Sequence, residues 1–230
     1  TAYQYEEDTA AQKGDDIVLT IDESIQSILE KHLEQACIEN ELKEGAAGII
    51  MNPKTGEIYA MASKPDFDLN NPTDLSQFEK YAIGMDDVIK DTESDNEETQ
   101  NSAVAQIRNK MWRNKAISDT YEPGSTFKIL TAAAALEEGV AGLNSQYYCS
   151  GGKQVADHFI HCHKSGGHGA EDFARGVINS CNVVFMELGM KLGSDKFREY
   201  FKAFGLTEKT GIELIGESGS VFYRGKMSES

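Results

Sequence analysis

Apolar and polar residues follow two different periods in the N-terminal part of the chain. A short apolar run at residues 17–21 predicts a strand. Apolar residues at helical spacing then predict an amphipathic helix from the N-cap Asp22 to about Leu42. Next, the runs at 46–52 and 57–63, joined by a Pro-Lys-Thr-Gly turn, predict a β-hairpin. A helix followed by two antiparallel strands indicates an α+β fold with a helix on one face of the sheet.

The rest of the chain alternates between segments without periodicity and helices. Residues 1–16 are polar and aperiodic, so we expect a linker or tail. Residues 86–100 are rich in acids and show no apolar repeat. We expect a solvated acidic insert there, with an acidic binding segment as the alternative. Further helices are predicted at residues 125–138, 170–179, 183–192 and 195–204.

Composition narrows the function classes. The 230 residues include 38 acidic and 22 basic ones, which gives a formal charge of −16. This balance disfavours nucleic acid as a partner, because a phosphate backbone must be met by clustered Lys and Arg. No apolar run approaches the roughly 20 residues that a membrane-spanning helix needs. Because the chain starts at Thr1 without a Met, we expect it to be a piece of a longer protein.

The segment with the clearest chemical signal is Tyr-Glu-Pro-Gly-Ser-Thr-Phe-Lys at residues 121–128. Its Pro-Gly pair forms a turn, after which Ser125 opens an apolar helix. Lys128 follows one turn later on the same face, so its amine is predicted to reach the Ser125 hydroxyl. A helix N-terminus suits a nucleophilic serine because it favours the negative charge of an attacked carbonyl. Partial burial would lower the pKa of Lys128 and let it accept the proton.

This Ser-x-x-Lys pattern is weak by itself. It recurs as Ser150-Gly-Gly-Lys153, in a Gly-rich loop where nothing fixes the two side chains together. The non-catalytic alternative for the first copy is an N-cap Ser125 and a solvated Lys128.

A second candidate element is Ser180-Cys181-Asn182, between two predicted helices. The Ser180 hydroxyl can relay a proton while the Asn182 amide binds a substrate carbonyl. Ordinary capping of the following helix is the alternative. Another Ser-x-Asn, at 94–96, is discounted because it lies in the acidic insert and precedes the candidate nucleophile.

The cysteines and histidines suggest a bridge more than a metal. Cys149 and Cys162 bracket a short loop and form a candidate disulfide in an oxidising compartment. His side chains crowd residues 158–168, but their spacing matches no usual zinc finger. A His-Cys-His run in an extended strand cannot point all of its side chains at one ion, so we expect no metal. Cys181 is expected to be only the variable middle residue of its motif, with a redox-sensitive thiol as the alternative.

In combination these motifs resemble the transpeptidase domain of class B penicillin-binding proteins. The similarity covers about residues 15–217. Its motifs are the segment with Ser125 and Lys128, Asn-Ser-Cys-Asn at 179–182, the hairpin at 51–63 and Lys-Thr-Gly-Ile-Glu-Leu-Ile-Gly-Glu at 209–217. The loop between Cys149 and Cys162 is similar to sporulation-type members from Gram-positive bacteria.

The resemblance implies a penicillin-binding, serine β-lactamase-like fold and a D,D-transpeptidase that cross-links peptidoglycan stem peptides. Ser125 would attack the D-Ala-D-Ala carbonyl, and its backbone N–H would supply half of the oxyanion hole. Lys128 would be the general base, Ser180 a proton relay and Asn182 a ligand for the substrate amide. β-Lactams would acylate Ser125, and no cofactor is implied. The full-length protein would be extracytoplasmic, anchored to the cell membrane and part of a cell-wall synthesis complex.

One departure from the family pattern concerns its third motif, a Lys-Thr-Gly on a strand downstream of Ser-x-Asn. The copies at 54–56 and 209–211 lie in the hairpin turn and just after a helix end. We therefore expect residues 17–230 to be the N-terminal portion of the domain, a helical subdomain plus part of an antiparallel sheet. The isolated chain would be weak or inactive.

Two other functions stay open at this point. A serine β-lactamase or β-lactam sensor uses the same Ser and Lys, but Glu187 lacks the usual flanking residues of a deacylating carboxylate. A non-catalytic scaffold fragment is the second.

Overall fold

The computed structural model describes residues 13–79 and 85–222. It divides between Ala116 and Ile117 into two compact units, which are treated separately below. The predicted linker at 1–16 lies mostly outside the described residues, and the sequence did not indicate this division. None of the described helices combines the length and hydrophobicity that crossing a bilayer requires.

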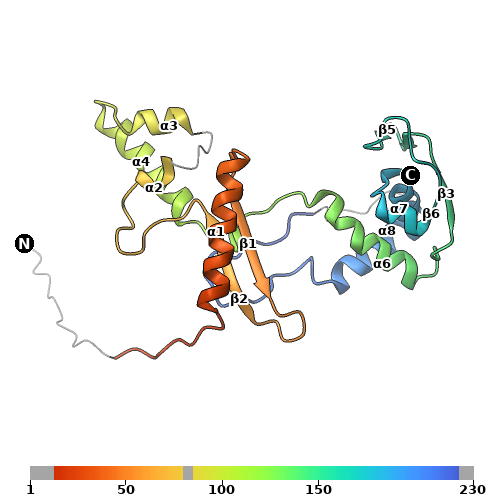
Figure 1. Ribbon diagram of the computed structural model, residues 1–230, viewed down its shortest axis with the longest axis horizontal. Coiled ribbons are helices and arrows are strands. Elements are labelled where there is room, and N and C mark those ends of the chain that lie inside the picture. Colours follow the sequence, from red (N-terminus) through yellow and green to blue (C-terminus); the bar gives the residue numbers. More distant parts are fainter. Residues whose placement is uncertain (1–12, 80–84, 223–230) are drawn as a thin grey trace, which may run out of the picture. The chain divides into compact units, whose positions relative to one another are not determined.

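The first unit contains a helix packed on a hairpin, as predicted (Figure 1). Its elements are α1 (Glu23–Glu39), β1 (Ala46–Met51), β2 (Ile58–Lys64), α2 (Ser76–Glu79), α3 (Asp86–Asp91) and α4 (Glu97–Trp112), and α5 (Lys115–Ser118) spans the division. The Asp22 side chain accepts a hydrogen bond from the Ile25 N–H at 3.0 Å, which confirms the predicted N-cap. A Cβ at Gly48 would lie 2.9 Å from Leu29, so this glycine lets β1 approach α1 closely.

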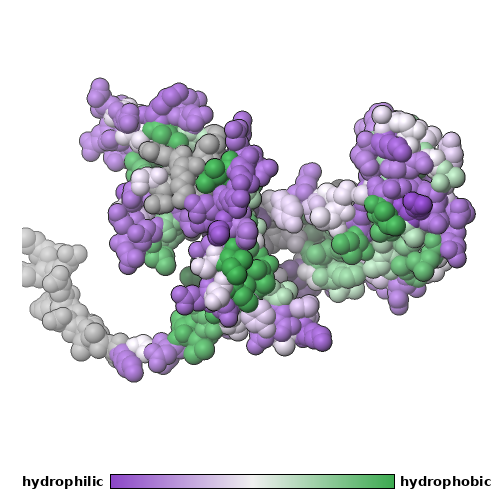
Figure 2. Space-filling model, viewed as in Figure 1, coloured by the Kyte–Doolittle hydropathy of each residue, from purple (hydrophilic) through white to green (hydrophobic). Residues whose placement is uncertain are grey.

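The strand predicted at 17–21 is wrong, because these residues form no ladder. At the end of this run, the Asp22 N–H donates to the Tyr59 carbonyl and the Thr20 hydroxyl donates to the Ile58 carbonyl. Ile17 and Val18 are 85% and 92% exposed. Figure 2 shows apolar surface where the chain enters α1. The apolar run therefore has the composition of a strand. Among the described residues, however, no strand pairs with it along its length.

No helix was predicted in the acidic stretch at 86–100, and this is corrected by the structure, because α3 and α4 occupy most of it. The Asn96 side chain caps α4 by accepting a hydrogen bond from the Thr99 N–H. Acidic residues fill the first turn of each helix, where the helix dipole favours negative charge. The buried side chains of α4 are Ala103, Ile107 and Met111, all beyond residue 100. The apolar repeat that reveals this helix therefore lies outside the acidic stretch.

The second unit is built around the packing of α6 against α8. Its elements are η1 (Gly124–Phe127, a 3-10 helix), α6 (Lys128–Glu137), β3 (Gln146–Cys149), β4 (Gly152–Val155), β5 (His158–His161), β6 (Gly169–Asp172), α7 (Phe173–Ile178) and α8 (Asn182–Ala203). β3 pairs with β6 and β4 with β5, both antiparallel. α8 is kinked at Gly193, where two separate helices were predicted. The helix predicted at 170–179 is a strand followed by α7, because Asp172 is the N-cap.

A substitution in α8 tests this core. Leu188 is fully buried, at 0% exposure, in the cluster that joins α6, α7 and α8. We expect Leu188→Ala to lower the free energy of unfolding by about 2–5 kcal/mol, because the cavity it leaves cannot fully collapse. Met190→Ala is the control on the same helix, since Met190 is 48% exposed. Denaturant unfolding of both variants measures the difference, and equal losses would contradict this packing.

Candidate active site

Ser125 lies in a tight turn that exposes it. Gly124 adopts a positive φ of 58°, and the 3-10 turn that follows carries Ser125 directly before α6. The backbone N–H of Lys128 donates to the Ser125 carbonyl, so both residues belong to one turn. Between them, Phe127 packs its ring 5.0 Å from that of Phe201 on α8. This contact anchors the turn to α8 while the serine stays exposed.

The Lys128 amine is held by the turn that precedes α8. Its Nζ donates to the Ser180 carbonyl at 2.6 Å, to Asn182 Oδ1 at 2.6 Å and to Ser180 Oγ at 3.1 Å. It also lies 5.3 Å from the centroid of the Phe185 ring. Burial lowers the pKa of Lys128, while its electrostatic interactions with Cys162 and Cys181 act in the opposite direction. The predicted direction of the shift is therefore confirmed.

The backbone of the Ser180–Asn182 turn is shaped to face Lys128. Ser180 adopts a positive φ of 47°, which is rare for a residue other than glycine. Cys181 occupies the N-cap of α8 and makes no side-chain capping bond. The Asn182 Nδ2 donates to the His161 carbonyl at 2.9 Å. The side chains of Ser180 and Asn182 thus contact the amine, and the alternative of ordinary helix capping is not what the structure contains.

The Lys128 amine, which was predicted to be able to reach the Ser125 hydroxyl, makes its hydrogen bonds elsewhere. Within the described residues, the Ser125 hydroxyl makes no side-chain hydrogen bond. The reason is that the Ser180–Asn182 turn offers the amine three oxygens, as many as an ammonium has N–H groups. Tertiary contacts therefore set the direction of the Lys128 side chain, and the Ser125 hydroxyl is left available to a ligand.

The discounted Ser-x-x-Lys and Ser-x-Asn copies have structural roles. Lys153 pairs with Glu187 at 2.9 Å and ties β4 to α8, while the Ser150 hydroxyl donates to a nearby backbone carbonyl. Ser94 accepts a hydrogen bond from the backbone of Asn96, which itself caps α4.

The two Lys-Thr-Gly copies lie outside the strands. The Lys54 N–H donates to the Asn52 side chain in the β1–β2 turn. The N–H and hydroxyl of Thr210 both donate to Glu217 Oε1, at 2.6 and 2.7 Å. Neither copy therefore has the strand placement that the family's third motif requires.

The candidate disulfide between Cys149 and Cys162 is not formed, because all four cysteines are free thiols. The ligand atoms of Cys149, Cys162, His168 and Cys181 instead lie within 4.8 Å of one another. Burial raises the pKa of Cys181, and the neighbouring Glu171 carboxylate raises it further. The sequence suggested a link between Cys149 and Cys162 alone, and only the fold brings the Cys181 thiol and the His168 ring to them.

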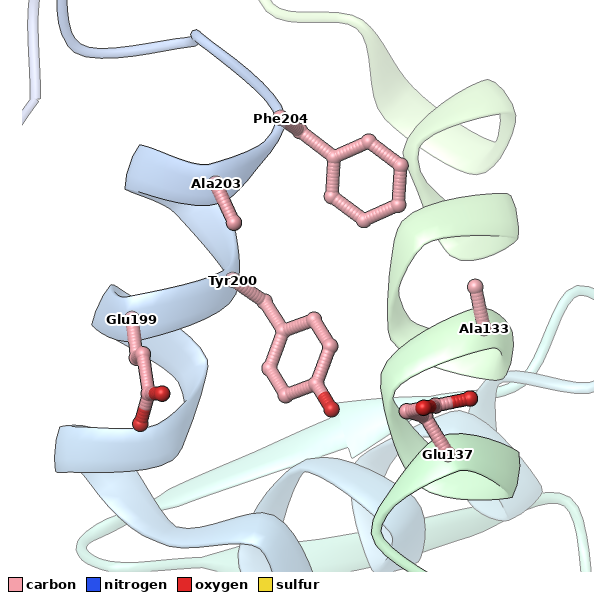
Figure 3. Close-up of a pocket in the computed structure, with 6 residues that line it drawn as sticks. All are labelled: Ala133, Glu137, Glu199, Tyr200, Ala203 and Phe204. Carbon is pink, nitrogen blue, oxygen red and sulfur yellow. The ribbon is translucent and has the colours of Figure 1, made fainter.

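A pocket of about 450 Å³ lies elsewhere on this unit, between α6 and α8 (Figure 3). Tyr200 on α8 and Phe204, directly after α8, point toward α6 there. Ala133, Glu137, Glu199 and Ala203 complete its lining. None of the candidate catalytic side chains lines this pocket, so the candidate site is the polar group around Lys128.

Comparisons with known proteins agree with this geometry. Residues 46–230 match the family described as "Penicillin binding protein transpeptidase domain". The chain is 37% identical over 216 residues to stage V sporulation protein D of Bacillus subtilis, covering 94% of this chain and 28% of that protein. It is 28% identical over 222 residues to the peptidoglycan D,D-transpeptidase FtsI of Escherichia coli, covering 93% and 30%. It thus spans less than a third of either relative.

A solved structure is similar over most of the chain. It is the penicillin G acyl-enzyme complex of penicillin-binding protein A from Mycobacterium tuberculosis. The TM-score is 0.65 at 26% sequence identity, over 87% of this chain and 42% of that one. The predicted α+β fold is therefore confirmed. With its family profile matched over most of its length, the chain belongs to the transpeptidase domain family of the penicillin-binding proteins.

Proposed function

We propose that this chain carries the acylating centre of a serine-type peptidoglycan D,D-transpeptidase. The observation that supports it most is the Lys128 amine, which the Ser180 and Asn182 oxygens hold one turn beyond the exposed Ser125. A partly buried amine with a lowered pKa is suited to accept a proton from a hydroxyl.

The reaction begins from the neutral amine of Lys128. The Ser125 Oγ attacks the carbonyl of a D-Ala-D-Ala stem peptide, and the hydroxyl proton passes to this amine. The C–N bond to the terminal D-Ala then breaks, and the Ser180 hydroxyl relays a proton from the Lys128 ammonium to the leaving amine. An amino group of a neighbouring stem peptide then attacks the resulting ester. Its proton passes to the Ser125 oxygen as the ester bond breaks, which forms the cross-link and restores the Ser125 hydroxyl. Because the substrate must draw the hydroxyl and the amine together, their hydrogen bond forms only in the complex.

Asn182 is proposed to orient the substrate amide. Its Oδ1 accepts from Lys128 and one N–H of its Nδ2 donates to the His161 carbonyl. A second N–H on Nδ2 is left to donate to a substrate carbonyl. The amide therefore links the general base, the β5 strand and the substrate.

β-Lactams are proposed to acylate Ser125 as analogues of the acyl-D-Ala-D-Ala group. The M. tuberculosis relative, solved as a penicillin G acyl-enzyme, supports this choice. By the same analogy the protein would act outside the cytoplasmic membrane, anchored to it within a cell-wall synthesis complex.

A β-lactamase function is less well supported. A class A β-lactamase needs a carboxylate that activates the deacylating water, and Glu187 instead pairs with Lys153 at 2.9 Å. The Glu187 side chain is engaged between α8 and β4, so its role in this unit is structural. A purely scaffolding role has no observation in its favour, since the site geometry would then serve no purpose.

The isolated chain is expected to react slowly with penicillin. Neither Lys-Thr-Gly copy lies on a strand of the described residues, so the groups that would bind the substrate carboxylate are not assembled. Mass spectrometry of the 230-residue chain incubated with benzylpenicillin measures the labelling. We expect a small labelled fraction after long incubation, confined to Ser125. Rapid stoichiometric labelling would contradict this expectation, whereas labelling at another serine would contradict the proposed function.

A further inference from the structure

A two-stranded hairpin lies next to the polar group around Lys128. It consists of β4 and β5, which pair only with each other among the described strands. An ion pair of 2.9 Å between Lys153 and Glu187 fixes β4 to α8. At the end of β5, the His161 carbonyl accepts from Asn182, whose Oδ1 accepts from the Lys128 amine. The last residue of β5 is therefore two hydrogen bonds away from the candidate general base.

One face of this hairpin presents an aromatic ring to solvent. Side chains alternate along a strand, so Phe159 and His161 lie on one face of β5 and Ile160 lies on the other. The rings of Phe159 and His161 meet edge to face, with their centroids 5.0 Å apart. Phe159 is nevertheless 55% exposed. The fold thus holds an aromatic ring at the surface beside the catalytic groups.

Gly152 on β4 provides the space that this ring occupies. A Cβ at position 152 would lie 2.5 Å from the Phe159 ring and 2.9 Å from the Ile160 carbonyl oxygen. The backbone of Gly152 does not have a positive φ, so its own conformation does not require glycine. The absence of a side chain at this position therefore serves the close approach of β5 and the placement of its exposed ring.

Polar groups on the same face complement the ring. Gln154 lies directly opposite Phe159 in the ladder and therefore shares its face. The Gln154 Nε2 donates to the Ala156 carbonyl at 2.9 Å, which fixes the amide and leaves its Oε1 able to accept a hydrogen bond. The neutral His161 ring carries one N–H that can donate. The face thus combines an apolar surface, a donor and an acceptor.

The local charge favours a ligand that contains a carboxylate. Acidic residues make up 38 of the 230 residues, but Asp157 is the single one in the sequence from 150 to 170. Its carboxylate lies 3.3 Å from the His158 ring. The same stretch contains Lys153, Lys164 and four histidines. A negative group therefore meets less repulsion here than elsewhere on this acidic chain.

We propose that Phe159, His161 and Gln154 bind the stem-peptide residue that precedes D-Ala-D-Ala. The residue that fits them is a diamino acid whose long side chain ends in a carboxylate and an amine. This inference rests on the proposed function, in which Asn182 holds a substrate amide. The His161 carbonyl lies 2.9 Å from Asn182 Nδ2, so a peptide held by Asn182 passes beside β5. Two residues of a strand span about 7 Å, which a side chain of five or six carbons can cover.

Each group of this face has a distinct role. The methylene groups of the ligand pack on the Phe159 ring, which removes apolar surface from water. The His161 N–H donates to the terminal carboxylate, and Gln154 Oε1 accepts from the terminal ammonium. A stem peptide with lysine at this position has no such carboxylate and cannot make the bond to His161. The hairpin would therefore determine which stem peptides the enzyme prefers.

Penicillins that differ only in their side chain test this without substrate turnover, because that side chain takes the place of the residue before D-Ala-D-Ala. One carries an aminoadipyl chain, which ends in a carboxylate and an amine, and one carries a hexanoyl chain of the same length without them. The third, 6-aminopenicillanic acid, has no acyl side chain. Acylation rate constants are measured on a polypeptide extended to the length of the relatives. We expect the aminoadipyl compound to react about 10- to 100-fold faster than the hexanoyl one, the usual effect of a hydrogen bond to a charged group.

Variants on the two faces of β5 identify the residues. His161→Ala is expected to bring the aminoadipyl-to-hexanoyl ratio close to one, and His161→Gln, which keeps an N–H donor, to retain part of it. Phe159→Ala is expected to slow both compounds about 10-fold relative to 6-aminopenicillanic acid, the effect of uncovering about two methylene groups. His158→Gln and Ile160→Ala are the matched controls, because these exposed residues lie on the opposite face of the same strand. Both controls should keep the parent ratios.

The outcomes separate this inference from the proposed function. If none of the three penicillins acylated Ser125, the proposed function would be wrong and this inference with it. Acylation at rates that do not depend on the side chain would overturn this inference alone. So would a preference that His161→Ala and Phe159→Ala retain, or one that the two controls lose equally. Dividing each rate by that of 6-aminopenicillanic acid on the same variant removes any general damage to the acylating centre.

Discussion

A Ser125→Ala variant, in a polypeptide extended to the length of the relatives, is expected to lose covalent labelling by penicillin completely. Alanine has no oxygen with which to form the acyl ester, and the other parts of the site cannot replace it. Because Ser125 is exposed and makes no side-chain hydrogen bond among the described residues, its loss should leave the fold unchanged. Intact-protein mass spectrometry after incubation with benzylpenicillin measures the adduct, and denaturant unfolding checks the stability.

The chain supplies a matched control for this variant. Ser150 stands in the same Ser-x-x-Lys spacing, but Lys153 is engaged with Glu187. Ser150→Ala should therefore retain full labelling. If Ser125→Ala were still labelled, or if Ser150→Ala were the variant that lost labelling, the assignment of the nucleophile would be wrong.

Replacing Lys128 by Met is expected to slow acylation by about 10²- to 10⁴-fold, the usual contribution of a positioned general base. Met fills much of the same volume without the amine, so the packing against Phe185 is largely retained while the three hydrogen bonds to Ser180 and Asn182 are lost. Lys153→Met is the control, because Lys153 pairs with Glu187 rather than with Ser180 or Asn182. Rapid-mixing measurements of penicillin acylation give the rate constants.

The pH dependence separates the base from a purely structural lysine. Burial lowers the pKa of Lys128 in the folded protein. Its amine therefore becomes neutral at a lower pH than the amine of a free lysine. Acylation by the unsubstituted protein should therefore increase with pH through this lowered pKa. The residual rate of Lys128→Met should not show that step. A step of equal size in both proteins would exclude Lys128 as the group that titrates.

The incorrect fold predictions at residues 17–21 and 86–100 have a common physical origin. Residues 17–21 have the composition of a strand, but a strand exists only when a partner meets its hydrogen-bonding groups. Residues 86–100 show no apolar face, but the α4 helix that begins among them is stabilised by Ile107 and Met111 further along. In both cases a local pattern was judged without the distant residues that decide its structure.

The sequence by itself determined the α1 helix and its Asp22 cap, the β1–β2 hairpin and the turn that presents Ser125, because each depends on residues within a few positions of one another. It also supplied the motifs that pointed to the penicillin-binding proteins. Tertiary structure decided where the Lys128 amine lies and which thiols meet His168. Those contacts join residues many positions apart, such as Lys128 with Asn182, and they exist only after α6, α8 and the strands have packed together.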